Sequence, residues 1–148
     1  MKINIKVIED GKLPEYKTDG SVGADCFARL KNDVVVESGK TATIPLGFAV
    51  EIPHGYEMQI RGRSGLASNL QIEQVMGTID QDYRGEVSAI IINHSDVRFV
   101  IKNNDRIAQA VICPIIKGEW CLTDKLSETK RGVKGFGSTG VNDERKIN

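Results

Sequence analysis

Short runs of alternating or β-branched residues recur along this chain, and turn-forming residues separate each run from the next. Residues 2–8 and 56–61 alternate polar with apolar side chains, and residues 106–112 form a further predicted strand with Ile107, Gln109 and Val111 on one face. Such alternation is typical of strands, and the Gly, Pro, Asn and Asp residues between the runs predict turns. Further short apolar or β-branched runs cover residues 34–36, 41–44, 48–52, 87–92 and 97–101. The pattern predicts an all-β fold.

The length and charge of the chain narrow its class. A chain of 148 residues is the size of one domain with a single core. Its 20 basic and 20 acidic residues give a formal net charge of zero, which argues against a nucleic-acid or membrane-surface partner. No apolar run approaches 18 residues and the N-terminus has no apolar h-region, so we expect a soluble, cytoplasmic protein without a membrane partner.

The cysteines do not predict a metal site or a disulfide framework. Cys26, Cys113 and Cys121 are odd in number and form no C-x-x-C pair, and His54 and His94 lie far from them in sequence. These spacings argue against structural zinc. Free thiols in a reducing compartment are the simpler interpretation.

Residues 77–87 place two carboxylates and a tyrosine between glycines. We expect a hairpin here, because strand-like residues follow and Gly77 and Gly85 tolerate turn conformations. Such a hairpin would present Asp80, Asp82 and Tyr83 on a short projection. A tight turn whose carboxylates meet only solvent is the alternative.

A calcium loop is excluded at this position. Asp80, Asp82 and Gly85 would occupy positions 1, 3 and 6 of an EF-hand loop. Position 5 would then be Arg84 and position 12 would be Ile91, so the cation would meet a positive charge and lose its bidentate carboxylate.

A second motif, residues 62–68, has the composition of an anion site. Ser64 is predicted to cap a short helix over residues 65–70, whose N-terminus would offer free N–H groups and a positive dipole. Arg63 adds a planar guanidinium suited to phosphate oxygens. A capped surface turn is the alternative.

Three polar or aromatic residues elsewhere remain open to two interpretations each. Asp25 either caps a turn or lies near a metal or phosphate. Gln109 lies on a predicted strand, where its amide is satisfied by backbone or used on a ligand. Trp120 is interpreted as a core or interface residue.

The chain ends in a glycine-rich segment. Residues 131–140 include Arg131, Phe136, Ser138 and Thr139 among four glycines, which suits close approach to phosphates and stacking on a planar ring. The segment lacks the G-K-[ST] of a Walker A loop. We therefore predict a β domain over residues 1–130 and a flexible tail over 131–148, with a merely disordered terminus as the alternative.

Taken together, these motifs resemble the homotrimeric dUTP pyrophosphatase (dUTPase) family. Five segments occur in that family's order, at residues 22–25, 63–67, 77–87, 105–109 and 131–140. The resemblance implies an all-β, jelly-roll-like subunit with one short helix. It also implies a homotrimer in which more than one subunit contributes to each active site.

The reaction implied by the resemblance is hydrolysis of dUTP to dUMP and pyrophosphate, with Mg²⁺ carried mainly on the triphosphate. This reaction limits uracil incorporation into DNA and supplies dUMP for dTTP synthesis. By the resemblance, Asp80 orients and deprotonates the attacking water, which suits a carboxylate ionised at neutral pH. Asp25 would reach the metal through water, or would have a turn and interface role instead.

The resemblance also implies which residues bind the substrate. Tyr83 would lie under the deoxyribose and exclude a 2′-hydroxyl, and the backbone of Gly77, Thr78 and Ile79 would pair with uracil. The phosphate ligands would be Arg63, Ser64, Gly65 and Gln109. The tail would close over the nucleotide with Arg131, Phe136, Gly137 and Ser138.

Two residues depart from the family pattern. Cys26 stands where Leu is usual, which is a change in packing. Gln74 stands where some members use a smaller or amide residue near the base, so a contact between Gln74 and uracil is a hypothesis.

Three other functions compete with this one. A dCTP deaminase of the same fold, or a bifunctional deaminase and pyrophosphatase, would release ammonia from dCTP. A dUTPase-like regulatory protein would bind a protein partner that dUTP displaces. A single-strand nucleic-acid binder is a poor fit, because the chain has only four Phe, three Tyr and one Trp and no net charge.

Overall fold

The computed structural model of the chain describes residues 1–135. The chain divides into two compact units, Met1–Ile116 and Lys117–Asn148, and each is described by itself. The predicted start of a functional tail at residue 131 rests on its motif and stays a prediction. Among the described residues, every helix and strand belongs to the first unit.

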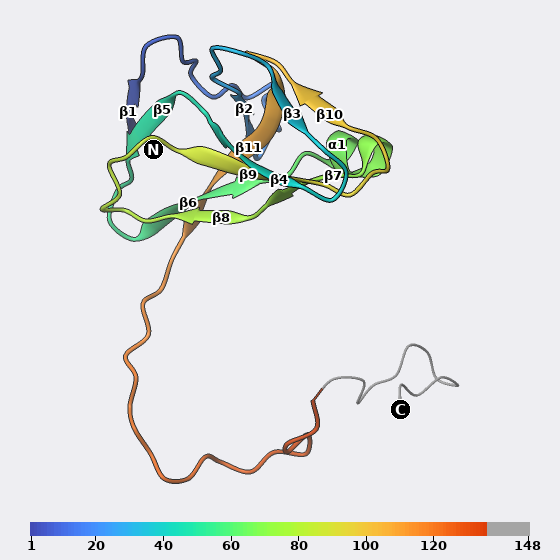
Figure 1. Cartoon of the computed structure of the whole chain (residues 1–148). Coiled ribbons are helices and arrows are strands. Elements are labelled where there is room, and N and C mark those ends of the chain that lie inside the picture. The colour runs from blue at the N-terminus through green and yellow to red at the C-terminus, as the bar shows by residue number, and fades with distance from the viewer. Residues whose placement is uncertain (136–148) are drawn as a thin grey trace. The chain divides into compact units, whose positions relative to one another are not determined.

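The first unit is built almost entirely of strands, which confirms the prediction of an all-β fold with one short helix (Figure 1). The single helix is α1 (Ser64–Leu70). The strands are β1 (Asn4–Val7), β2 (Ala24–Phe27), β3 (Val34–Val36), β4 (Thr41–Pro45), β5 (Phe48–Glu51), β6 (Tyr56–Arg61), β7 (Ile72–Val75), β8 (Gly77–Ile79), β9 (Ser88–Asn93), β10 (Phe99–Ile101) and β11 (Arg106–Pro114).

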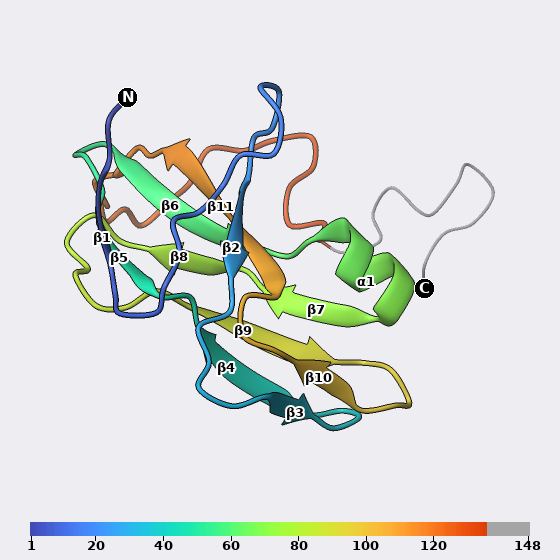
Figure 2. The ribbon, with the colours of Figure 1, turned by 90° about the horizontal axis from the view of Figure 1, so that it is seen from above.

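All strand pairs are antiparallel. The largest sheet has four strands in the order β2-β11-β6-β8, and a three-stranded sheet has the order β4-β9-β7. Two further pairs are β1-β5 and β10-β3. Figure 2 shows β3, β4, β7, β9 and β10 on one side of the unit and β2, β6, β8 and β11 on the other.

The core consists of aliphatic side chains and one phenylalanine from these sheets. The largest side chains below 2% exposure include Phe48, Ile44, Leu46, Ile60 and Ile91. Full burial of such a side chain contributes about 1.5–3 kcal/mol relative to exposure. The core thus gives the loops at both ends of the unit a rigid support.

Cys26 belongs to this core. The side chain is fully buried, and burial raises the pKa of its thiol to about 12. The thiol therefore stays protonated near neutral pH. Cys26 in place of the Leu that is usual in the family is therefore a change in core packing, as predicted.

The predicted hairpin over residues 77–87 is wrong. Strand β8 pairs with β6, with Gly77 opposite Ile60 and Ile79 opposite Met58, whereas β9 pairs with β4 and β7. Residues 80–87 therefore cross from one sheet to the other. At the end of this crossing, Val87 exchanges backbone hydrogen bonds of 2.9 Å with Leu46 and Phe48.

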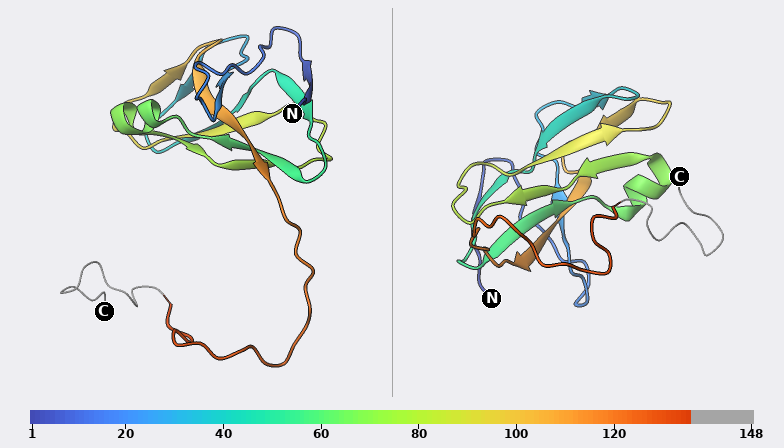
Figure 3. Two further views of the ribbon diagram at one scale, coloured as in Figure 1. Left: turned by 180° about the vertical axis from the view of Figure 1, so that it is seen from behind. Right: turned by 90° about the horizontal axis from the view of Figure 1, so that it is seen from below.

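The predicted N-cap is also wrong by one residue. Helix α1 begins at Ser64, and Arg63 is its extended N-cap residue, without a side-chain capping hydrogen bond. The carbonyl of Arg63 accepts the backbone N–H groups of Leu66 and Ala67 at 3.1 and 3.2 Å. Helix α1 packs near β7 at one end of the unit (Figure 3).

Residues 117–135 form no helix or strand. Trp120 is 98% exposed, so the interpretation of Trp120 as a core residue is wrong, and its place in an interface stays a prediction. Within residues 1–135, no helix has both the length and the apolar character needed to span a bilayer.

Candidate active site

Asp25 and two arginines form an ionic cluster at one end of the four-stranded sheet. Asp25 is only 9% exposed, and its Oδ1 accepts a hydrogen bond from Arg63 Nε at 3.1 Å. Its Oδ2 accepts from an Arg106 guanidinium nitrogen at 3.3 Å, and Arg63 also donates to the Arg106 carbonyl at 2.9 Å. The turn-capping role considered for Asp25 is therefore wrong. The carboxylate orients Arg63, as a charge removed from water requires a partner.

Gln109 lies directly beside this cluster. It is opposite Asp25 in the register of β11 and β2, and its Nε2 donates to the Gly62 carbonyl at 2.7 Å. A Cβ atom at Gly23 would lie 2.1 Å from Gln109 Oε1. The backbone of Gly23 and Gly62 thus holds the amide in one orientation.

Gln74 lies at the same end of the unit, on β7. Its backbone and Cβ would be within 3.6–3.7 Å of a Cβ atom at Gly62. The side chain is 7% exposed and donates through Nε2 to the Val75 carbonyl, while Oε1 is the one buried side-chain polar atom without a partner in the described part of the chain. An unsatisfied buried oxygen costs free energy, so a donor from a ligand would be favourable here. The contact with uracil stays a prediction.

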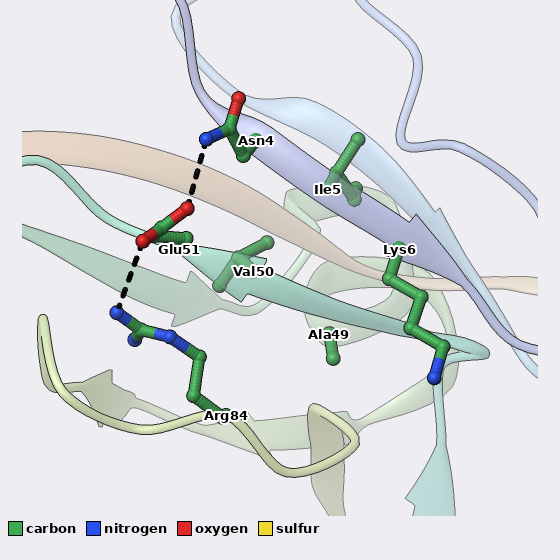
Figure 4. Close-up of a pocket in the computed structure, with 7 residues that line it drawn as sticks. All are labelled: Asn4, Ile5, Lys6, Ala49, Val50, Glu51 and Arg84. Carbon is green, nitrogen blue, oxygen red and sulfur yellow. Dashed lines mark hydrogen bonds and ion pairs between the residues drawn. The ribbon is translucent and has the colours of Figure 1, made fainter.

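Asp80 and Tyr83 lie on the crossing segment, residues 80–87. Asp80 is exposed, and its carbonyl accepts the backbone N–H of Tyr83 at 3.1 Å, which closes a turn. Arg84 donates to the carbonyls of Gln81 and Tyr83 at 2.7 and 3.0 Å and pairs with Glu51 at 3.6 Å. Figure 4 shows the Arg84 guanidinium directed at Glu51, which Asn4 also contacts. Arg84 therefore ties the segment to β5.

Glu86 provides the second anchor of this segment. Its two carboxylate oxygens accept from Arg29 at 2.8 and 2.7 Å, and Oε1 also accepts the Gly47 backbone N–H at 3.0 Å. The hydrogen bond from Arg29 is the main cause that lowers the pKa of the Glu86 carboxyl, against partial burial, which raises it. The Tyr83 hydroxyl in turn donates to the Glu86 carbonyl at 3.0 Å.

The two groups of residues lie apart along the first unit. Ile79 is opposite Met58 on β6, and Gly62 comes four residues after Met58 in the sequence. Four residues of strand span about 13 Å. Figure 2 shows α1 at one end of the unit and the segment after β8 at the other. One chain therefore brings Asp25, Arg63 and Gln109 together but keeps Asp80 away from them.

The described side chains do not form a divalent-cation site. Residues 1–135 contain no cluster of three or more His, Cys, Asp or Glu placed to hold a metal ion. The Asp25 carboxylate already binds two guanidinium groups.

The structure describes only part of the predicted tail, up to residue 135. Arg131 Nε donates to the Lys134 carbonyl at 3.0 Å. Phe136, Gly137 and Ser138 lie outside the described residues.

Sequence reasoning missed Arg106, Arg29 and Glu86 as site-organising residues. The signal for the first was present, because Asp25 lies between Ala24 and Cys26 and a buried carboxylate needs a cation. The sequence does not indicate which of the 20 basic residues supplies it.

Known proteins resemble this chain over most of its length. A model of the dUTPase family matches residues 9–140. The deoxyuridine 5′-triphosphate nucleotidohydrolase of Treponema denticola is 44% identical over 143 residues, which cover 95% of this chain and 99% of that protein.

Solved structures with a similar fold include phage dUTPases. The dUTPase of Staphylococcus bacteriophage 80alpha with dUpNHpp has a TM-score of 0.87 and 29% identity, covering 95% of this chain and 99% of that one, and is described as controlling transfer of virulence genes. A mutant dUTPase from phage phi11 of S. aureus has a TM-score of 0.77 and 26% identity over 84% of this chain and 98% of that one. It is described with a structural Mg(II) ion.

Proposed function

Because the chain belongs to the dUTPase family, we propose that it hydrolyses dUTP to dUMP and pyrophosphate, with Asp80 holding and deprotonating the attacking water. The observation that carries the assignment to Asp80 is its place on a segment anchored by Arg84 and Glu86. A base held in fixed geometry contributes through positioning as well as proton transfer. Asp80 is exposed, so a water molecule and a phosphorus centre can both approach it.

Base recognition is assigned to the backbone of β8. This strand pairs only with β6, so it is the edge of the four-stranded sheet and its outer N–H and C=O groups are unpaired within the sheet. Unpaired edge groups can pair with the polar edge of uracil. Cytosine has the opposite donor and acceptor pattern and would leave backbone groups unsatisfied. We assign the uracil contacts to Gly77, Thr78 and Ile79.

Phosphate recognition is assigned to the residues around Asp25. Arg63, oriented by Asp25, would bind phosphate oxygens together with Ser64, Gly65 and Gln109. A separation of about 13 Å along one chain argues that these residues serve a site whose Asp80 comes from another copy. The family resemblance supplies the number of copies, and we propose a homotrimer with active sites between subunits.

Two further parts of the proposal come from the family resemblance. Mg²⁺ would enter on the triphosphate of dUTP, which suits the lack of a carboxylate cluster among residues 1–135. The tail would close over the nucleotide with Arg131, Phe136, Gly137 and Ser138. Separately from the resemblance, we propose that the protein acts in the cytoplasm.

The proposal is tested by pyrophosphate release from dUTP, dCTP, dTTP and UTP with Mg²⁺. We expect turnover of dUTP alone. Asp80→Asn should lower kcat by about 10²- to 10⁴-fold while retaining dUpNHpp binding, because a general base contributes that range. Asp82→Asn is the matched control, since Asp82 is exposed two residues away, and it should keep nearly full activity.

Other results would favour the competing functions. Wild-type kcat in Asp80→Asn would contradict the assigned base. Ammonia release from dCTP would favour a deaminase. Tight dUTP binding without turnover in the wild type would favour a regulatory nucleotide-binding protein.

A further inference from the structure

The ring of Tyr83 lies against the backbone of Gly85. A Cβ atom at Gly85 would be 2.4 Å from the Tyr83 hydroxyl oxygen and 2.6 and 2.9 Å from ring carbons Cζ and Cε2. The backbone of Gly85 is outside the left-handed region, so an alanine there would be conformationally allowed. A side chain at position 85 would therefore collide with the tyrosine ring, whereas a left-handed backbone does not call for glycine there.

A short chain of contacts holds the ring in place over Gly85. The Tyr83 hydroxyl donates to the Glu86 carbonyl at 3.0 Å, and the Glu86 carboxylate is bound by Arg29 and by the Gly47 N–H. Tyr83 remains 43% exposed, so part of its ring is free to meet a ligand. The ring is thus supported from the protein side and open on the other.

We propose that Gly85 is a positioning residue that determines discrimination between deoxyribose and ribose, by letting the Tyr83 ring lie close to the main chain. This inference rests on the proposed function, in which Tyr83 lies under the sugar. To relieve a contact of 2.4 Å to the 3.4 Å of ordinary packing, the ring must move by about 1 Å. That movement breaks the bond to the Glu86 carbonyl and removes the fixed surface that excludes a 2′-hydroxyl.

The experiment compares kcat/KM for dUTP and UTP in wild type, Gly85→Ala and Gly20→Ala. A Cβ atom at Gly20 meets nothing within 4 Å, so Gly20→Ala is the matched control and should keep the wild-type ratio. We expect Gly85→Ala to lower the dUTP to UTP ratio about tenfold, the scale on which a small steric change alters discrimination. A general loss of stability would lower both activities and leave the ratio unchanged, which would overturn the proposal.

A double-mutant cycle separates the ring contact from other effects of Gly85. In a Tyr83→Ala background the displaced ring is absent, so adding Gly85→Ala should not change the ratio further. Additive effects would overturn the proposal. Tyr83→Phe loses the hydrogen bond from the hydroxyl to the Glu86 carbonyl and should lower the dUTP to UTP ratio by a smaller factor. If Gly85→Ala does not fold, an unchanged ratio in Tyr83→Phe would overturn the proposal.

Binding of dUMP and UMP to the same variants, measured calorimetrically, separates a failure of the proposed function from a failure of the role proposed for Gly85. If the wild type fails to hydrolyse dUTP, the proposed function fails, and the affinity ratio still tests the placement of the ring. If the wild type hydrolyses dUTP and Gly85→Ala keeps both the kinetic and the affinity ratio, the role of Gly85 is wrong.

Discussion

At the scale of single residues, hydrogen bonds hold the polar side chains of the candidate site in fixed orientations. Asp25 has two arginine partners, and Arg63 has a second acceptor in the carbonyl of Arg106. Gln109 is confined by Gly23 and by the carbonyl of Gly62. A guanidinium and an amide held in this way lose little further freedom when they bind phosphate, so affinity benefits from pre-organisation.

Asp25→Asn tests whether Asp25 acts by orienting Arg63. The neutral amide keeps the shape but loses the charge that binds both arginines, so we expect KM for dUTP to rise about tenfold. The free energy of unfolding should fall by about 1–2 kcal/mol, measured by urea titration. The Mg²⁺ concentration giving half-maximal rate should not change. A large shift in that Mg²⁺ concentration would instead support a role for Asp25 at the metal.

At the scale of elements, residues 80–87 are a bridge between two sheets and not the tip of a hairpin. Their ends are fixed by β8 on one side and by the backbone bonds of Val87 to Leu46 and Phe48 on the other. Arg84 and Glu86 then attach the middle of the bridge to β5 and to Arg29. Such anchoring allows an exposed segment to carry precisely oriented chemistry.

The bond between Arg29 and Glu86 predicts a pH dependence of stability. The pKa of Glu86 is lowered from 4.5 in the folded protein, so the unfolded chain binds the proton at higher pH. Its stabilising contribution is complete above pH 4.5 and is lost as the pH falls through the folded pKa. Urea unfolding of Glu86→Gln at fixed protein concentration should therefore show a shallower loss of stability below pH 4.5 than wild type.

Glu37→Gln is the control for this titration, because Glu37 is exposed. It should follow the wild-type curve. Equal slopes for wild type and Glu86→Gln would show that the ion pair does not contribute to the acid sensitivity of the fold.

At the scale of the whole molecule, the proposed function divides each active site into two halves, which lie apart on one chain. Asp25, Gln109 and Arg63 lie near the end of β6 that leads into α1, whereas Asp80 and Tyr83 follow Ile79, which is opposite Met58 farther back along β6. A closed assembly of identical chains can place one half of each site against the other half from a neighbour. This arrangement predicts that defects in the two halves complement each other.

Co-expression of Asp80→Asn with Arg63→Ala tests this complementation. Each variant alone should be inactive. Random mixing should restore activity at about one quarter of the sites, because an intact site needs Asp80 from an Arg63→Ala chain and Arg63 from an Asp80→Asn chain. No recovery in mixed oligomers would place Asp80 and Arg63 of one site on one chain. As a control, wild type mixed with the double variant should leave about one quarter of sites active for a shared site and about half for a single-chain site.

Most of the strands and the short helix could be predicted from the sequence, because alternation, β-branched runs and turn residues act over a few neighbouring positions. Strand β7 was not predicted. The order of the five motifs along the chain likewise indicates the family without any knowledge of how the strands pair. The tertiary structure decided what local patterns leave open: β8 pairs with β6 and not with β9, and Asp25 binds arginines 38 and 81 positions away. These contacts join segments distant in sequence, so they depend on how the sheets pack and not on the residues beside them.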